Sequence, residues 1–259
     1  MRDRFAVFLR GYKGGVFFIM KKIILLVVLA ALLAGCAPAG EAWRPDFEFT
    51  EFDRDDESTW EFSLVAAIEE EGIYLFGGKE PGMVLYRNGQ RTYFDEWWWW
   101  SPRLVMPKMV YRDFGGDGEN ELAIVLMVDA GRGVSVRDLH VLAGDTVYSL
   151  HGAYAHEWIT APMHAEAYED NMSFRFDFMG ENYEFENYNY AYSGALTGIR
   201  VGNIVRFDFE YTGIVVTMSV GATYENFPSP ESFGQIEATV VFDGESLTLS
   251  DYIFHVGVN

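Results

Sequence analysis

The chain is poor in cysteine and in basic residues. Cys36 is the only cysteine among 259 residues, so the chain can form no internal disulfide. Lysine and arginine number 19 against 39 acidic residues, which gives a formal net charge of −20. A surface of that charge repels nucleic acid and anionic lipid headgroups, so we expect no nucleic-acid partner.

Familiar catalytic motifs are also missing. The sequence has no GxSxG, no phosphate-binding glycine loop, no SxxK and no HExxH. Its five histidines show no zinc-binding spacing, and we interpret them as scattered rather than as ligands of one metal. Pairs of carboxylates for glycoside hydrolysis occur in any chain this acidic, so they carry no information without a measured separation.

The amino end holds an apolar run, Ile23–Leu33, that follows Lys21 and Lys22. The run is shorter than the roughly 20 residues that a bilayer-spanning helix needs. A positive start, a short apolar centre and small residues before a cleavage point are typical of a secretory signal. A short membrane anchor with an incidental cysteine is the alternative.

The end of that run, Leu33-Ala34-Gly35-Cys36, resembles the lipobox of a bacterial lipoprotein signal peptide. The resemblance implies cleavage after Gly35 and acylation of the Cys36 thiol by lipid such as palmitate. We therefore expect residues 1–35 to be leader and signal peptide, with the true translation start at Met20. The mature protein would be anchored on the extracytoplasmic face of the cytoplasmic membrane, and no free thiol would remain for catalysis.

Two regions follow Cys36. Residues 36–59 are acidic with little apolar periodicity, and we interpret them as a tether. Residues 60–259 are interpreted as a β-rich extracytoplasmic domain. From Cys36 onward there are 13 basic and 38 acidic residues. Such an acidic domain is repelled by anionic lipid headgroups, which suits a domain that is tethered to a membrane without lying on it. A division into two subdomains near residues 150–170 stays open.

The domain shows alternation of apolar and polar residues, which predicts strands. Val84–Arg87 and Gln90–Phe94 flank Asn88-Gly89, a sequence typical of a type I′ hairpin turn. Asp243-Gly244 predicts a second hairpin. One buried and one exposed face per strand is typical of antiparallel sheets, so we predict a mostly β fold, either a sandwich or an open-barrel-like meander. Residues 63–71 are a candidate for a short helix, and residues 151–168 are ambiguous.

The strongest chemical motif is the acidic glycine loop, Asp113–Glu121. Oxygen donors at alternate positions, with glycine where the chain turns sharply, are what a calcium-binding loop needs. We expect calcium ligands from Asp113, Asp117, Glu119 (through its carbonyl) and Glu121. Ile124 stands where an EF-hand has a carboxylate, and an apolar strand-like run follows, so the loop is not an EF-hand.

One position of this loop departs from the calcium pattern. Gly115 occupies the third position, where aspartate or asparagine is usual, and the missing carboxylate predicts weaker binding. The alternative is a glycine-rich turn that Asp113 caps without any metal. If calcium does bind, we expect it to brace the turn rather than to take part in catalysis.

The loop and the strand after it resemble the calcium loops of FG-GAP or VCBS-type extracellular β proteins. Together with Pro102-Arg103, Gly131–Val141, Val201–Phe207 and the strands from Phe233 to Phe254, the loop resembles an uncharacterised family of lipoproteins from Gram-positive bacteria. The resemblance covers about residues 60–259. It implies a β-rich extracytoplasmic domain and supplies no activity.

A run of four tryptophans, Trp97, Trp98, Trp99 and Trp100, is the candidate binding surface. On a strand, two of the rings would face each side. Inward rings would be core, whereas an exposed pair could stack on a sugar or on an apolar patch of another protein. We favour a core role with one pair partly exposed, and name cell-wall glycan or protein as the partner.

These observations favour a membrane-anchored extracytoplasmic lipoprotein with a binding or structural role and a calcium-stabilised loop. The alternative is an enzyme, a hydrolase that acts on cell-wall glycan. An enzyme should show a cleft with convergent carboxylates or histidines of perturbed pKa. A binding module should show an aromatic surface or groove.

Overall fold

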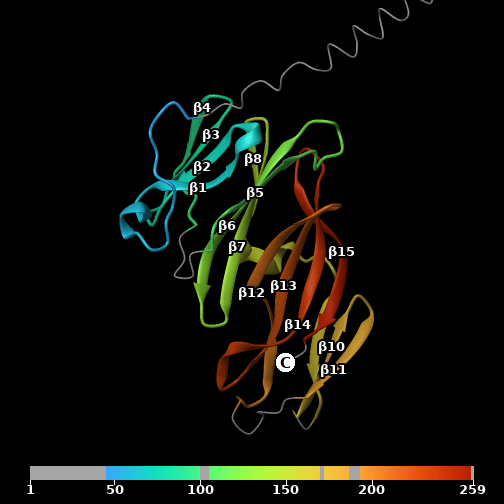
Figure 1. Cartoon of the computed structure of the whole chain (residues 1–259). Helices are drawn as coiled ribbons and strands as arrows, with labels where there is room; N and C mark the ends of the chain where they lie inside the picture. Colours follow the sequence, from blue (N-terminus) through green and yellow to red (C-terminus); the bar gives the residue numbers. More distant parts are fainter. Residues whose placement is uncertain (1–44, 100–104, 170–171, 187–192, 258–259) are drawn as a thin grey trace, which may run out of the picture. The chain divides into compact units, whose positions relative to one another are not determined.

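The computed structural model describes residues 45–99, 105–169, 172–186 and 193–257, all of which belong to one compact unit, Trp43–Asn259 (Figure 1). The predicted lipobox with Cys36, the start of the predicted tether, Trp100 and Pro102-Arg103 lie outside the described residues. Within the described ranges, no helix is both long and apolar enough to cross a membrane.

The described fold is mostly β and contains three sheets with no closed barrel, which confirms the predicted fold class. The first sheet has the strand order β1-β2-β3-β4. Its strands are β1 (Ser63–Ile68), β2 (Ile73–Gly77), β3 (Met83–Arg87) and β4 (Gln90–Phe94). Asn88 and Gly89 take φ values of 53° and 75° between β3 and β4, which confirms the predicted hairpin.

The largest sheet has eight strands in the order β15-β14-β13-β12-β7-β6-β5, with β8 also paired to β7. Its first four strands along the chain are β5 (Lys108–Arg112), β6 (Glu121–Gly131), β7 (Val134–Ala143) and β8 (Thr146–Leu150). The later four are β12 (Leu196–Glu210), β13 (Gly213–Tyr224), β14 (Phe227–Phe242) and β15 (Leu247–Val256). β14 and β15 form the second predicted hairpin. The pairing of β12 with β7 is parallel, whereas the other strand pairings are antiparallel.

A three-stranded sheet in the order β11-β10-β9 completes the fold. It consists of β9 (Met163–Ala167), β10 (Ser173–Phe178) and β11 (Glu181–Glu186). The described helices are short: η1 (Glu57–Trp60), η2 (Glu69–Glu71), η3 (Gly152–Tyr154) and α2 (Ala155–Trp158). The ambiguous stretch 151–168 therefore holds two helical turns and a strand.

The helix considered for residues 63–71 is wrong. Ser63–Ile68 is a strand, and only Glu69–Glu71 forms a helical turn. The physical reason is burial: Ser63 and Val65 point into the protein from a strand that pairs with β2 along most of its length. Tertiary pairing here overrides a helical pattern that was only two turns long.

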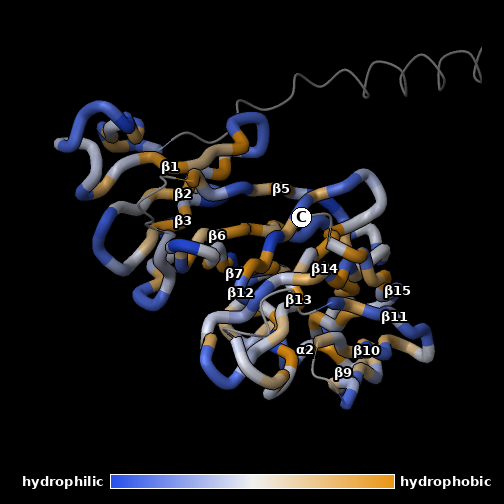
Figure 2. Tube along the Cα trace, turned by 90° about the horizontal axis from the view of Figure 1, so that it is seen from below, coloured by the Kyte–Doolittle hydropathy of each residue, from blue (hydrophilic) through white to orange (hydrophobic). Residues whose placement is uncertain are grey.

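Burial of strand β6 on both faces explains the apolar run in its sequence. Leu122, Ile124 and Leu126 face one hydrophobic cluster, together with side chains of the four-stranded sheet. Ala123 and Val125 face a second cluster, together with strands β12–β15 and the three-stranded sheet. A strand buried on both faces needs apolar residues at every position. In Figure 2 the hydrophilic segments lie mainly in the loops at the strand ends.

Part of the predicted tether packs on the domain. Phe47 lies 5.4 Å from Phe76 between ring centroids, and Phe52 joins the cluster that contains Trp99. The Thr59 hydroxyl is buried and donates to main-chain carbonyls of the same segment. Residues 47–59 thus bury aromatic surface against the four-stranded sheet.

Candidate functional site

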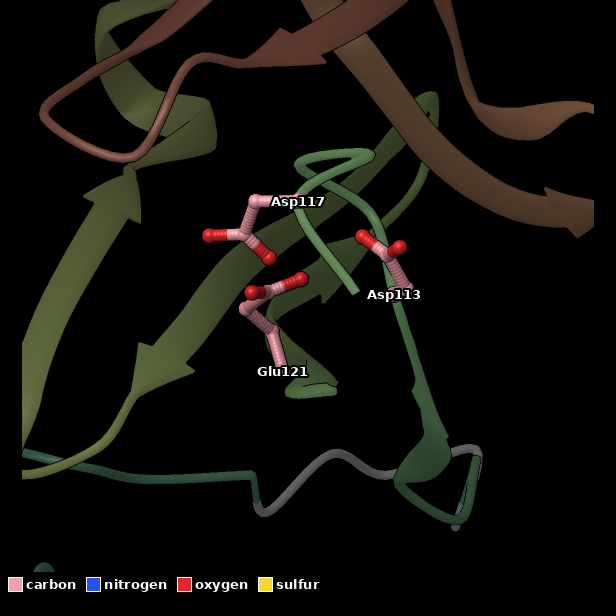
Figure 3. Close-up of side chains that lie close together, drawn as sticks. All are labelled: Asp113, Asp117 and Glu121. Atoms are coloured by element: carbon pink, nitrogen blue, oxygen red, sulfur yellow. The ribbon is translucent and has the colours of Figure 1, made fainter. Parts of the chain in front are cut away.

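The acidic loop joins β5 to β6 and brings three carboxylates together. Arg112 and Glu121 are cross-strand partners, so Asp113 and Glu121 stand side by side at the ends of adjacent strands. Oxygen atoms of Asp113, Asp117 and Glu121 all lie within 4.8 Å of one another (Figure 3). Among the described residues, this is the only group of three or more potential metal-binding side chains.

Main-chain amides hold these carboxylates in place. Asp113 accepts hydrogen bonds from the N–H groups of Gly116 and Gly118, and Asp117 accepts one of 2.8 Å from Glu119. Glu121 is 3% exposed and accepts a hydrogen bond of 2.7 Å from the Phe114 N–H. Gly116 and Gly118 have φ values of 73° and 92°, which side chains other than glycine rarely adopt.

Two further positions of the loop, Glu119 and Gly115, bear on whether it can bind calcium. Glu119 is exposed, and its carboxylate does not belong to the group of three. A Cβ atom built on Gly115 would lie 3.9 Å from Glu121 Oε1 and 4.0 Å from Asp117 Cγ, both ordinary contact distances. Gly115 does not have a positive φ. An aspartate at this position would therefore fit, with its carboxylate beside the other two.

The tryptophan run alternates between buried and partly exposed rings. Trp97 and Trp99 are buried, with exposures of 7% and 0%, whereas Trp98 between them is partly exposed. The Trp98 indole N–H donates to the Lys79 carbonyl at 3.1 Å, which fixes the plane of the ring. Of the three rings that the structure describes, that of Trp98 is therefore the one available to solvent.

Trp98 lines a pocket of about 380 Å³ that a second group of polar residues also lines. Asp138 and His140 come from one face of β7, and Ser149 and His151 come from β8 and the residue after it. His140 and Ser149 are cross-strand partners, and His140 Nδ1 shares a hydrogen bond of 2.7 Å with Ser149 Oγ. His151 Nδ1 donates to Asp138 Oδ2 at 2.8 Å.

This polar group was not found by sequence reasoning, although a signal was present. Asp138 and His140 lie two positions apart on β7, and Ser149 and His151 lie two positions apart on the other side of the turn at Gly144-Asp145. The remaining three histidines do not join them: His156 lies near Glu157, His164 is the cross-strand partner of Asp177, and His255 lies near Glu237. His140 and His151 are the pair that the fold brings together, at 5.8 Å between ring centroids.

His140 is held neutral by its surroundings. It is 2% exposed and stacks on Trp97 at 4.3 Å, and Trp97 in turn stacks on Phe94 at 3.8 Å. Burial, with a smaller contribution from nearby His151, lowers the pKa of His140 to about 3. At neutral pH this ring therefore offers one hydrogen-bond donor and one acceptor and carries no charge.

The lowered pKa of His140 predicts a pH-dependent stability. Below about pH 6.5 the unfolded chain binds a proton on this histidine that the folded chain excludes, so stability falls as the pH drops toward 3. We expect His140→Gln to remove about 2 kcal/mol of the stability loss between pH 7 and pH 5. Urea unfolding at both pH values measures it. His164→Gln, at an exposed histidine, should leave the loss unchanged, and an equal effect of both variants would contradict the prediction.

Comparison with known proteins adds no relative: no family model, no curated protein and no solved structure matches the chain.

Proposed function

We propose that this protein is a lipid-anchored lipoprotein on the extracytoplasmic face of the membrane and acts there as a binding or structural module. In this proposal a calcium ion braces the loop between β5 and β6. The observation that carries it is the group formed by Asp113, Asp117 and Glu121, whose oxygens lie within 4.8 Å of one another. The predicted lipobox at Cys36 and the acidic, cysteine-free chain after it support the location.

Calcium is the cation that suits this loop. Three carboxylates at such short range repel one another, and a divalent cation between them would offset that repulsion. The donors are oxygen atoms alone, which favours calcium or magnesium over transition metals that prefer imidazole or thiolate. Calcium tolerates irregular geometry and a carbonyl ligand such as that of Glu119, whereas magnesium demands a near-ideal octahedron.

The buried histidine of the pocket suits binding rather than catalysis. General acid–base catalysis works best with a group whose pKa lies near the working pH. His140, the buried histidine of the pocket, has a pKa of about 3 and is a weak base. Its ring instead suits a fixed hydrogen-bonding role beside Ser149.

The calcium proposal predicts a thermal shift. A ligand that binds only the folded state stabilises it, and saturation at about 100 times the dissociation constant contributes about 2.7 kcal/mol. For a chain of this size we expect the melting temperature to rise by about 5–10 °C in millimolar calcium. Differential scanning calorimetry of the full chain in detergent, with calcium or with a chelator, measures it.

Three variants sharpen that experiment. Asp117→Asn should abolish the shift, whereas Asp145→Asn, which removes the same charge from an exposed turn, should preserve it. Gly115→Asp should give the shift at a lower calcium concentration, because it adds the missing carboxylate where a side chain has room. No calcium-dependent shift in the native chain or in Gly115→Asp would refute the calcium site.

A further inference from the structure

The pocket beside Trp98 has the size and composition of a small-molecule site. Its volume of about 380 Å³ lies within the range of about 300–1,000 Å³ that is usual for ligand pockets. Phe94, Trp97, Trp98 and Val128 supply an apolar side, and the polar residues of β7 and β8 supply the other. Ligand sites typically combine such an apolar wall with a few placed polar groups.

The polar side is rigid and offers hydrogen bonds of both kinds. Asp138 is held by the His151 ring and by the Gly152 N–H, each at 2.8 Å. With Nδ1 of His151 engaged by Asp138, its Nε2 atom is left to hydrogen-bond to a ligand, and the ring is about half exposed. Ser149 is exposed, and its hydroxyl can donate or accept while it remains bonded to His140.

On the apolar side, one ring is free to receive a ligand. The faces of Trp97 are covered by Phe94 and by His140, whose rings stack on it at 3.8 Å and 4.3 Å. Trp98 is partly exposed, and its hydrogen bond to Lys79 holds its ring in one orientation. A ring held in place loses little conformational entropy when a ligand stacks on it.

The charge of the lining disfavours anionic ligands. Asp95, Glu96 and Asp138 line the pocket, and among the described residues no lysine or arginine does. Phosphates, nucleotides and acidic polymers would meet carboxylates without a compensating cation. A ligand rich in hydroxyl groups, in contrast, can donate to the carboxylates, bond to Ser149 in either direction and hydrogen-bond to Nε2 of His151.

We propose that this pocket binds an uncharged sugar ring that stacks on Trp98 and hydrogen-bonds to Ser149, His151 and the carboxylates that line the pocket. The inference rests on the proposed binding role and specifies its ligand class. The apolar C–H face of a pyranose matches an indole ring, and its hydroxyls match the mixed donors and acceptors opposite. Calcium is not needed at this site, because the acidic loop contributes no lining residue.

The test is a calorimetric titration of the full chain in detergent with three neutral trisaccharides: chitotriose, maltotriose and cellotriose. We expect at least one to bind with a dissociation constant in the micromolar to millimolar range. Trp98→Ala should weaken binding at least tenfold, through loss of the stacking surface. Ser149→Ala should weaken it about threefold to tenfold, as expected for one neutral hydrogen bond.

Matched controls stand outside the pocket lining. Tyr93→Ala removes a more exposed aromatic ring on neighbouring β4, and Thr146→Ala removes a hydroxyl from β8 itself. Both should bind as the native chain does. Inorganic phosphate and spermidine serve as anionic and cationic probes, and neither should compete with the sugar.

The proposal is overturned if none of the trisaccharides binds, if the control variants lose affinity as the pocket variants do, or if phosphate or spermidine binds in place of sugar. Two variants distinguish failure of the sugar site from failure of the calcium site. Asp117→Asn should bind sugar normally, and Trp98→Ala should keep the calcium-dependent thermal shift, because the two sites share no residue.

Discussion

Replacement of Trp99 by alanine is expected to lower the free energy of unfolding by about 3–5 kcal/mol. The Trp99 side chain is fully buried and belongs to the cluster that joins the four-stranded sheet to β6. The Phe52 ring packs edge-on against it, with 5.3 Å between ring centroids. Truncation removes this contact area and leaves a cavity that the surrounding strands cannot fill without moving.

The neighbouring residue provides the control for that experiment. Trp98→Ala removes the same chemical group from the adjacent position, but the ring is partly exposed and makes one hydrogen bond to a carbonyl. We expect a loss of only about 1 kcal/mol. Urea unfolding followed by far-ultraviolet circular dichroism compares the two variants. Equal losses would mean that Trp99 does not belong to the core.

The second large effect concerns Cys36, which lies outside the described residues. If its thiol carries the lipid, Cys36→Ala should remove nearly all lipid labelling, because the chain has no other cysteine. One acyl chain gives only marginal membrane binding, so stable anchoring requires a modification with more than one chain on this residue. We expect the variant either to leave the membrane fraction or to accumulate there as uncleaved precursor.

Metabolic labelling with a palmitate analogue, followed by membrane fractionation and intact-protein mass spectrometry, measures both outcomes. Ala39→Ser is the control, because Ala39 lies three residues after Cys36, the predicted first residue of the mature chain. This variant should be labelled and anchored as the native chain is. Lipid labelling that persists in Cys36→Ala would disprove the lipobox. A precursor peptide that spans Arg10 to Met20 would disprove translation from Met20.

Much of the fold could be predicted because its signals are local. Alternation along β10 and β12 and the turn at Asn88-Gly89 depend on neighbouring residues only, and the structure confirms these strands and the hairpin. The acidic loop was also local, since Asp113, Asp117 and Glu121 are close in sequence and need only one hairpin to meet. Ser63–Ile68 was harder, because its state depends on pairing with another strand.

The pocket could not be predicted, for a physical reason. Trp98 follows the four-stranded sheet, whereas His140 and Ser149 belong to the eight-stranded sheet, about 40–50 positions later in the chain. Whether they meet depends on how two sheets pack, and packing is decided by the shape of the whole core rather than by any local pattern. The same packing made Trp99 fully buried and left Trp98 partly exposed.

By itself, the sequence determined the β class, the hairpins and the acidic character, because strand periodicity, turn geometry and charge are properties of short segments. The tertiary structure alone decided which tryptophan faces solvent and which polar residues share a pocket with it. It also decided that His140 is buried and uncharged at neutral pH, because desolvation requires atoms from several strands to close around one ring.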